Sequence, residues 1–174
     1  MGISYKYGDH TYGEIKGVGR RGNIIVGKYC SISTGAQAIL TGHCTNWIST
    51  FPFNEKWGAL VNSGLTINDV VIENDVWIGN GTTIISPAKI SNGAIIGANS
   101  VVRGIIEPYS TTIGNPAKTI KVRFTDSQIL KLLKIAWWNW DEEKIKTNLH
   151  LICSDKIDEF LDRHFIKEVN NVAV

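Results

Sequence analysis

The sequence is poor in cysteine and has no excess of charge of one sign. Its three cysteines form no CxxC pair, so we predict no disulfide framework and expect a reducing cytoplasm as the compartment. The formal net charge is +2 over 174 residues. A charge this small does not favour nucleic acid or an anionic membrane as a partner.

Long apolar runs are missing as well. No stretch approaches the roughly 20 residues that a membrane-spanning helix needs, and residues 1–17 hold no apolar signal core. We therefore predict a cytoplasmic protein without a membrane partner. A chain of 174 residues can bury a core, and it suits one domain with a modest extension.

Glycine and tryptophan are plentiful but unevenly placed. The 17 glycines lie before residue 115, whereas three of the six tryptophans fall within residues 137–140. Near Thr125 the composition changes from Gly, Asn, Ile and Val to Lys, Leu, Asp and Glu. This change predicts a first domain over residues 1–124 and a C-terminal extension over residues 125–174.

A six-residue repeat dominates the first domain. Aliphatic residues recur at Ile72, Ile78, Ile84, Ile90, Ile96 and Val102. Small or β-branched residues lie two positions before them, at Val70, Val76, Thr82, Ala88, Ala94 and Ser100. The same registers appear earlier at Val26, Ile32 and Ala38, with Cys30 and Ala36. We predict that both registers face a buried core, which makes Cys30 a core residue and not a nucleophile.

A period of six fits neither an α-helix nor a simple alternating strand. It fits a short strand followed by a tight corner, and Gly and Asn at 79–81, 91–93 and 97–99 suit corners because both tolerate positive φ. Three such segments make a triangular coil of about 18 residues, and successive coils stack about 4.8 Å apart. The sequence therefore predicts a mainly β protein with a parallel β-helix.

The repeat is interrupted once, over about residues 39–68. This loop excursion is too long for a corner and too hydrophobic for a linker, and long insertions in compact domains are usually functional. It contains His43, the only histidine of the repeat region, together with several aromatic residues. Because no second histidine lies near His43, we predict no metal site.

After Thr125 the apolar spacing becomes helical. Ile129, Leu132 and Leu133 follow that spacing, and Thr125 or Asp126 can cap the first helix. We expect the helices and their tryptophans to pack on the open end of the β-helix or on a neighbouring subunit, since an exposed terminal coil is an unpaired edge.

Several segments resemble the hexapeptide-repeat acetyltransferases. They read NDVWIG at 74–79, IIGANSVV at 95–102 and IGNPAK at 113–118, and IAWWNWD at 135–141 is similar to the xenobiotic branch that acetylates chloramphenicol and streptogramins. The resemblance covers roughly residues 24–150. It implies a left-handed parallel β-helix, a homotrimer with active sites between subunits, and acetyl-CoA as the co-substrate.

The resemblance also implies roles for single residues. His43 corresponds to the catalytic base, which removes the proton of an acceptor hydroxyl during direct transfer. The positions expected to bind acetyl-CoA are Trp77, Asn80, Gly97, Ala98, Ser100, Arg103, Lys118 and Lys121. A ping-pong reaction through the adjacent Cys44 is the less favoured alternative, because the family transfers the acetyl group directly.

The loop after His43 is expected to bind the acceptor, through Asn46, Trp47, Phe51 and Phe53. It departs from the drug-acetylating relatives, which commonly carry Asn before the histidine and a longer insertion, whereas Gly42 stands here. We therefore favour a saccharide hydroxyl as the acceptor. The alternatives are an antibiotic of the chloramphenicol or streptogramin type, a non-catalytic β-helix scaffold, and a carbonic anhydrase-like metalloenzyme whose zinc ligands this chain lacks.

Overall fold

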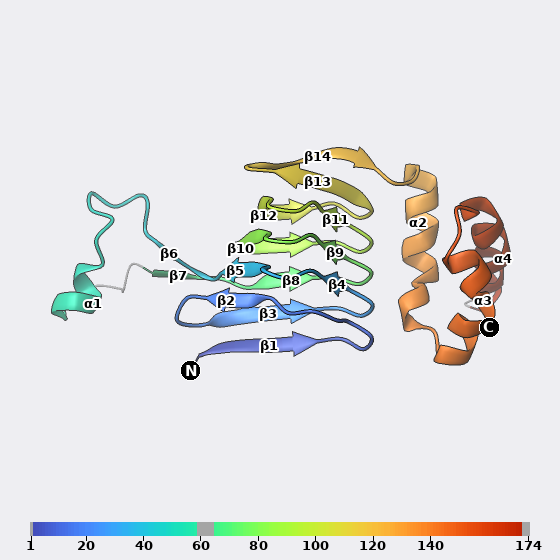
Figure 1. Ribbon diagram of the computed structural model, residues 1–174, viewed down its shortest axis with the longest axis horizontal. Coiled ribbons are helices and arrows are strands. Elements are labelled where there is room, and N and C mark those ends of the chain that lie inside the picture. Colours follow the sequence, from blue (N-terminus) through green and yellow to red (C-terminus); the bar gives the residue numbers. More distant parts are fainter. Residues whose placement is uncertain (1, 59–64, 172–174) are drawn as a thin grey trace. The chain divides into compact units, whose positions relative to one another are not determined.

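The computed structural model describes residues 2–58 and 65–171, and it divides into two compact units, one ending at Lys121 and the other beginning at Val122. The first is a solenoid of short strands with one long excursion, and the second is helical (Figure 1). The predicted mainly β fold, a β-solenoid followed by C-terminal helices, is confirmed.

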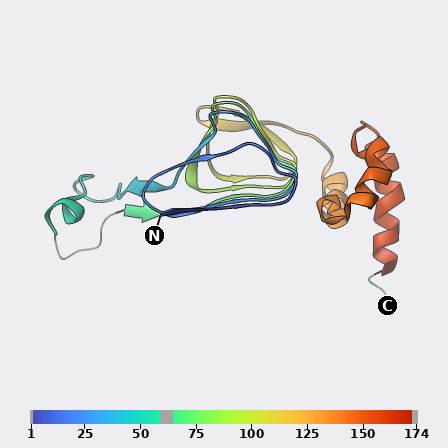
Figure 2. The ribbon, with the colours of Figure 1, turned by 60° about the horizontal axis from the view of Figure 1, so that its bottom comes forward.

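The strands of the solenoid form three flat walls, and Figure 2 shows their triangular outline. The first wall contains β1 (Ile3–Tyr7), β3 (Gly22–Val26), β8 (Val70–Ile72) and the second halves of β10 (Thr83–Ile90) and β12 (Val101–Ile106). The second contains β2 (Lys16–Val18), β5 (Gln37–Ile39) and the first halves of β10 and β12. The third contains β4 (Ser31–Ile32), β9 (Trp77–Ile78), β11 (Ile95–Ile96), β13 (Ser110–Gly114) and β14 (Ala117–Val122).

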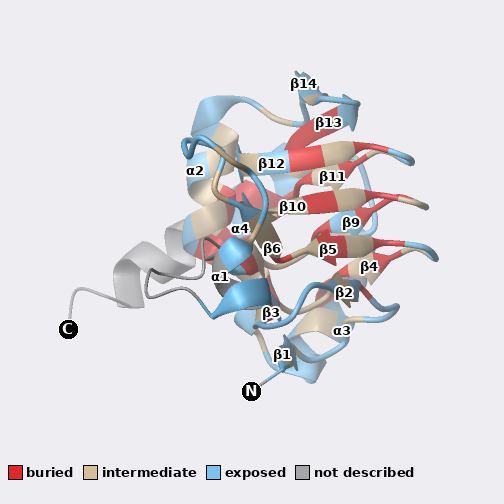
Figure 3. Cartoon of the chain, turned by 90° about the vertical axis from the view of Figure 1, so that its left-hand side faces the viewer, coloured by how far each residue is buried: buried red, intermediate tan, exposed pale blue. Residues whose placement is uncertain are grey.

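The two registers of the repeat fill the interior. Side chains alternate between the two faces of a strand, so every second residue of each short strand points inward. All twelve predicted register positions between Val70 and Val102 are buried, none with more than 6% of its surface exposed. In Figure 3 the buried residues accordingly form one continuous column through the coils. Cys30 is also fully buried, and its thiol donates to the carbonyl oxygen of Glu73 at 3.0 Å.

The corners recur with the same period. Positive φ values occur at Asp75, Gly81, Gly93 and Asn99, six or twelve residues apart. Two constraints favour glycine at position 93: its φ is +68°, and an added Cβ would lie 2.3 Å from the Tyr109 ring. The position at 87, where this series predicts another such corner, is instead Pro87 after a cis peptide bond, and β10 continues through it.

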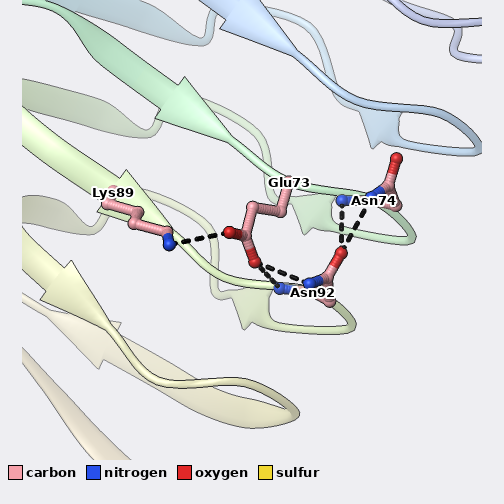
Figure 4. Close-up of polar contacts among 4 residues, drawn as sticks. All are labelled: Glu73, Asn74, Lys89 and Asn92. Atoms are coloured by element: carbon pink, nitrogen blue, oxygen red, sulfur yellow. Dashed lines mark hydrogen bonds and ion pairs between the residues drawn. The ribbon is translucent and has the colours of Figure 1, made fainter. Parts of the chain in front are cut away.

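A line of polar side chains joins neighbouring coils at one corner (Figure 4). The amide oxygen of Asn92 accepts from the backbone and side-chain nitrogens of Asn74, at 3.0 and 2.9 Å. The Asn92 amide nitrogen donates to a carboxylate oxygen of Glu73 at 2.6 Å, and Lys89 pairs with the other oxygen at 2.8 Å. These bonds satisfy backbone groups at a corner, where no strand ladder can do so.

Two tyrosines lie across the N-terminal coil. Tyr5 and Tyr7 stack in register on the inward residues Ile24 and Val26, and their hydroxyls accept from the backbone nitrogens of Gly17 and Ile15, both at 3.1 Å. Burial raises the pKa of the Tyr7 hydroxyl. A cavity of about 870 Å³ opens here, larger than the one beside His43. We interpret it as the incompletely filled end of the core, since Ile15, Ile32 and Ala36 line it from inside.

The second unit contains α2 (Asp126–Ile135), a 3-10 turn at Trp137–Asn139, α3 (Glu142–Ile152) and α4 (Ile157–Asn171). Thr125 caps α2 through a reciprocal capping box with Gln128. Within this unit Trp138 is buried, and Trp140 packs against the rings of Phe160 and His164. The role of the tryptophans in covering the β-helix stays a prediction.

Candidate active site

The excursion leaves the second wall as a two-stranded arm. β6 (Thr41–His43) follows the fully buried Leu40 and pairs antiparallel with β7 (Leu65–Ile67), so that His43 lies opposite Leu65. A short helix, α1 (Phe53–Trp57), lies between them near the far end of the arm (Figure 1). The buried Leu40 anchors the start of β6 to the solenoid, and pairing with β7 holds the rest of β6. Together they fix the position of the His43 backbone.

One hydrogen bond orients the His43 ring. Nδ1 lies 2.8 Å from the carbonyl oxygen of Thr50, seven residues further along the arm. A carbonyl oxygen can only accept, so Nδ1 carries the proton. In the neutral ring this leaves the lone pair on Nε2. His43 is solvent-exposed, so that nitrogen is open to a bound molecule.

A cavity of about 320 Å³ lies at the root of the arm, within the size range of small-molecule sites. Three predicted site residues, His43, Asn46 and Arg103, line it together. The remaining lining residues come from the wall and from the start of the arm: Ile39, Thr41, Gly42, Cys44, Thr45, Ile85 and Ser86. The structure therefore brings Arg103, predicted as an acetyl-CoA contact, into the cavity of the proposed base.

The other predicted acetyl-CoA contacts lie elsewhere on the solenoid. Trp77 points outward from the third wall with 52% of its surface exposed. Ala98 is exposed at a corner, and Asn80 donates to the carbonyl oxygen of Thr34 at 2.8 Å. A Cβ at Gly97 would lie 2.5 Å from the Ile113 side chain, so packing within the wall already requires a glycine there.

Ser100 is not on the outer surface, and Lys121, although exposed, lies on the other side of β14 from Lys118. Ser100 is fully buried in the inward register, and its hydroxyl accepts from the backbone nitrogen of Gly114 at 3.0 Å. Lys118 and Lys121 are both on β14, three residues apart, and alternation places them on opposite sides of that strand. Thr119 touches the inward Thr112, so Lys121 is on the inward side and Lys118 on the outward side.

Comparisons with known proteins identify the family. Residues 69–104 match the family model described as bacterial transferase hexapeptide (six repeats). The chain is 42% identical over 142 residues to a chloramphenicol acetyltransferase of Klebsiella aerogenes, across 77% of this chain and 68% of that protein. It is 41% identical over 157 residues to a probable macrolide acetyltransferase of Lysinibacillus sphaericus, across 85% of this chain and 87% of that protein. The chain belongs to the hexapeptide-repeat acetyltransferases.

A solved structure agrees with the fold of this hexapeptide-repeat acetyltransferase. A hexapeptide-repeat-containing acetyltransferase of Vibrio cholerae superposes with a TM-score of 0.50 at 20% identity, covering 71% of this chain and 68% of that one. The predicted family, its resemblance to the xenobiotic branch and the enzyme class, an acetyltransferase that uses acetyl-CoA, are confirmed by the relatives.

The predicted acceptor residues of the acetyltransferase divide into two groups. Asn46 lines the cavity, whereas Phe51 and Phe53 form an aromatic cluster with Trp57 further along the arm, with successive ring centroids 4.8 Å apart. Trp47 is exposed on the same arm and, like the cluster, does not line the cavity. The aromatic residues therefore present an apolar surface that is separate from the cavity lining.

Sequence reasoning missed the wall side of the cavity. Ile39 and Ile85 are outward residues next to the inward register, and Ser86 precedes the cis proline. Pro87, in place of the expected corner Gly or Asn, was the available signal. Among the described residues, no group of three or more His, Cys, Asp or Glu side chains is placed to hold a metal, and no helix is long and apolar enough to cross a membrane.

Proposed function

We propose that the enzyme transfers an acetyl group directly from acetyl-CoA to a hydroxyl of a small antibiotic, with His43 as the general base. The observation that carries this proposal is the hydrogen bond from Nδ1 of His43, which lines a ligand-sized cavity, to the Thr50 carbonyl. It holds the ring in one orientation and in the tautomer whose Nε2 can accept a proton.

The proposed step balances without a covalent enzyme intermediate. Nε2 of His43 accepts the proton of the acceptor hydroxyl as its oxygen attacks the thioester carbonyl carbon. The tetrahedral adduct then expels the thiolate as the carbon–sulfur bond breaks, and the imidazolium returns its proton to that sulfur. Throughout, the Nδ1 bond to Thr50 stays in place, and it stabilises the cationic ring because a carbonyl oxygen also accepts from imidazolium.

The route of acetyl-CoA is proposed from the exposed residues of the outer surface. Trp77 offers an aromatic face, Ala98 offers a small side chain where the pantetheine arm can approach, and Lys118 offers an ammonium group for a phosphate. Trp77 belongs to the third wall and His43 leaves from the second. We propose that a homotrimer brings the third wall of one copy against the arm of another.

An antibiotic acceptor is better supported than the saccharide predicted from the arm. The relatives that match 77% and 85% of this chain are named for chloramphenicol and macrolides. The saccharide prediction rested on Gly42 and on the length of the loop after His43. Gly42 and the start of that loop line the cavity together with Ile39 and Ile85, whose apolar side chains suit a drug better than a sugar.

Release of CoA in the presence of chloramphenicol, a streptogramin A, a macrolide and an amino sugar tests the function. His43→Ala is expected to lower kcat/KM about 10²- to 10⁴-fold, while His150→Ala, an exposed histidine of the helical unit, leaves it unchanged. Cys44→Ala is expected to stay active, because the transfer is direct. Full activity of His43→Ala, or a pre-steady-state burst that Cys44→Ala abolishes, contradicts the mechanism. Turnover of only the amino sugar restores the saccharide alternative.

A further inference from the structure

A row of outward residues crosses the second wall and ends at a cation. Val18 pairs with Ile39, Ile39 with Ile85, and Ile85 with Arg103, across four neighbouring parallel strands. Each of these residues follows an inward one, so the four side chains form a single ladder on the outer surface. Three of them are apolar, and the last, on β12, is the only charged residue of the row.

The arm closes over this ladder to make the cavity. Ile39, Ile85 and Arg103 line its wall side, while His43 and Asn46 line its arm side. A molecule held against the His43 ring therefore rests on an apolar floor with a guanidinium at its end. A guanidinium is a cation with several N–H donors and no acceptor.

The charge of Arg103 is not neutralised by the described part of the chain. Its side chain is exposed and forms no ion pair with any described side chain. None of the described lining residues of the cavity is acidic. A cationic ligand would therefore meet an unopposed positive charge there, whereas an electron-rich oxygen would find a donor.

Arg103 is poorly placed to bind the phosphates of acetyl-CoA. In that molecule the thioester and the diphosphate lie at opposite ends of the pantetheine arm. If the thioester reaches His43, the diphosphate lies far outside a cavity of about 320 Å³ that contains both His43 and Arg103. The side chain is thus positioned for the acceptor, at the reacting end of the co-substrate.

We propose that Arg103 is a specificity-determining residue, which selects neutral acceptors that carry nitro or carbonyl oxygens and rejects acceptors that carry an amino group. This inference rests on the proposed function and narrows its acceptor class. Among the antibiotics considered above, it favours chloramphenicol and streptogramin A over macrolides, whose amino sugar is cationic at neutral pH.

The test compares kcat/KM for chloramphenicol with that for a macrolide bearing a dimethylamino sugar. Reversing the charge with Arg103→Glu is expected to raise the macrolide-to-chloramphenicol ratio by roughly tenfold or more, a conservative value for a solvent-exposed charge. Arg103→Lys, which keeps the charge, is expected to leave the preference for chloramphenicol in place. Lys6→Glu is the matched control, because Lys6 is exposed on β1 in the first wall, whereas the ladder crosses the second wall.

Binding of both drugs to the His43→Ala protein, measured by calorimetry, separates this inference from the proposed mechanism. The same charge dependence of affinity should appear there without turnover. A ratio that changes less than about twofold in Arg103→Glu overturns the proposal, as does a wild-type preference for the macrolide. A raised KM for acetyl-CoA with an unchanged acceptor ratio also overturns it and assigns Arg103 to the co-substrate. Arg103→Gln replaces the charge-reversed variant if that protein does not fold.

Discussion

The stacked coils from Val70 to Ile106 and the arm from Thr41 to Ile67 differ in what holds them in place. The inward side chains of these coils are buried, and their strands pair through the backbone with the strands of neighbouring coils. In the described part of the arm, the contacts are an antiparallel strand pair, a few local hydrogen bonds such as that from His43 to the Thr50 carbonyl, and a cluster of partly exposed aromatic rings. Stability thus comes from the periodic part, and chemistry is proposed to come from the part that interrupts it.

The largest effect on stability is expected from a cavity in the wall. Ile84 is fully buried, so Ile84→Ala should lower the free energy of unfolding by about 2–5 kcal/mol. Phe51→Ala removes a larger side chain, but 47% of its surface is exposed on the arm, and unfolding should change by less than about 1 kcal/mol. Urea unfolding of both variants checks this. Equal destabilisation would mean that the arm is part of the cooperative core.

The fold of the solenoid was predictable because the same kinds of inward side chain recur every six residues. Burial of one residue type every six positions leaves a pattern that no local conformation other than a short strand and corner explains, and those positions are all buried. Ser100 belongs to the same register, so its burial could have been predicted and its role as a cofactor contact discounted. Likewise, two lysines three apart on one strand, Lys118 and Lys121, cannot share a side.

The arm was predictable only as a break. His43 could be recognised because it begins the interruption, but its bond to Thr50 depends on how seven residues turn back, which no period specifies. The cavity also needs Ile39 and Ile85, which are adjacent in space through strand pairing and 46 residues apart in sequence. Long-range pairing of this kind becomes visible only once the stacking of the coils is known.

The corner network should contribute less than the core. Asn92→Ala removes the acceptor of the Asn74 backbone nitrogen and the donor to Glu73, so the free energy of unfolding should fall by about 1–3 kcal/mol. Lys89→Met breaks only an ion pair whose lysine side chain is 51% exposed, and it should cost about 0–1 kcal/mol. Unfolding in low and high salt distinguishes them. Salt should weaken the Lys89 contribution and leave that of Asn92 unchanged.

A smaller effect on activity is expected inside the arm. The hydroxyl of Ser49 accepts from the backbone nitrogen of Phe51 at 3.1 Å and so holds the Thr50 carbonyl toward His43. Ser49→Ala should lower kcat/KM about two- to tenfold, as loss of one modest hydrogen bond implies, without changing stability. Thr50→Ala is the control, since it keeps the carbonyl. A larger loss in Thr50→Ala than in Ser49→Ala would assign the effect to the threonine side chain.

The smallest expected effect is the pH dependence of stability that the buried Cys30 thiol causes. Burial raises the pKa of the Cys30 thiol above its ordinary value of 9.0. As pH rises through that value, the unfolded chain loses the proton and the folded chain keeps it, so the unfolded state binds fewer protons and the free energy of unfolding falls. Between pH 7 and pH 9 this contribution should be a few tenths of a kcal/mol, steepening above pH 9 toward at most about 1.4 kcal/mol per pH unit.

Cys30→Ala should remove the part of the pH slope that the thiol contributes, because alanine occupies the same small inward register at Ala36 and Ala38 and does not titrate. The Tyr7 hydroxyl, whose pKa is also raised, contributes a slope of the same sign that stays in every variant. Cys153→Ala, at an exposed cysteine of the helical unit, should leave the slope as it is. Urea unfolding at pH 7, 9 and 10 measures the difference between the two variants. A slope in Cys30→Ala as steep as that in Cys153→Ala would show that the thiol ionises in the folded coil as readily as in water. The interior of the wall would then admit solvent at this corner, and the contrast with the exposed arm would be weaker than the buried registers indicate.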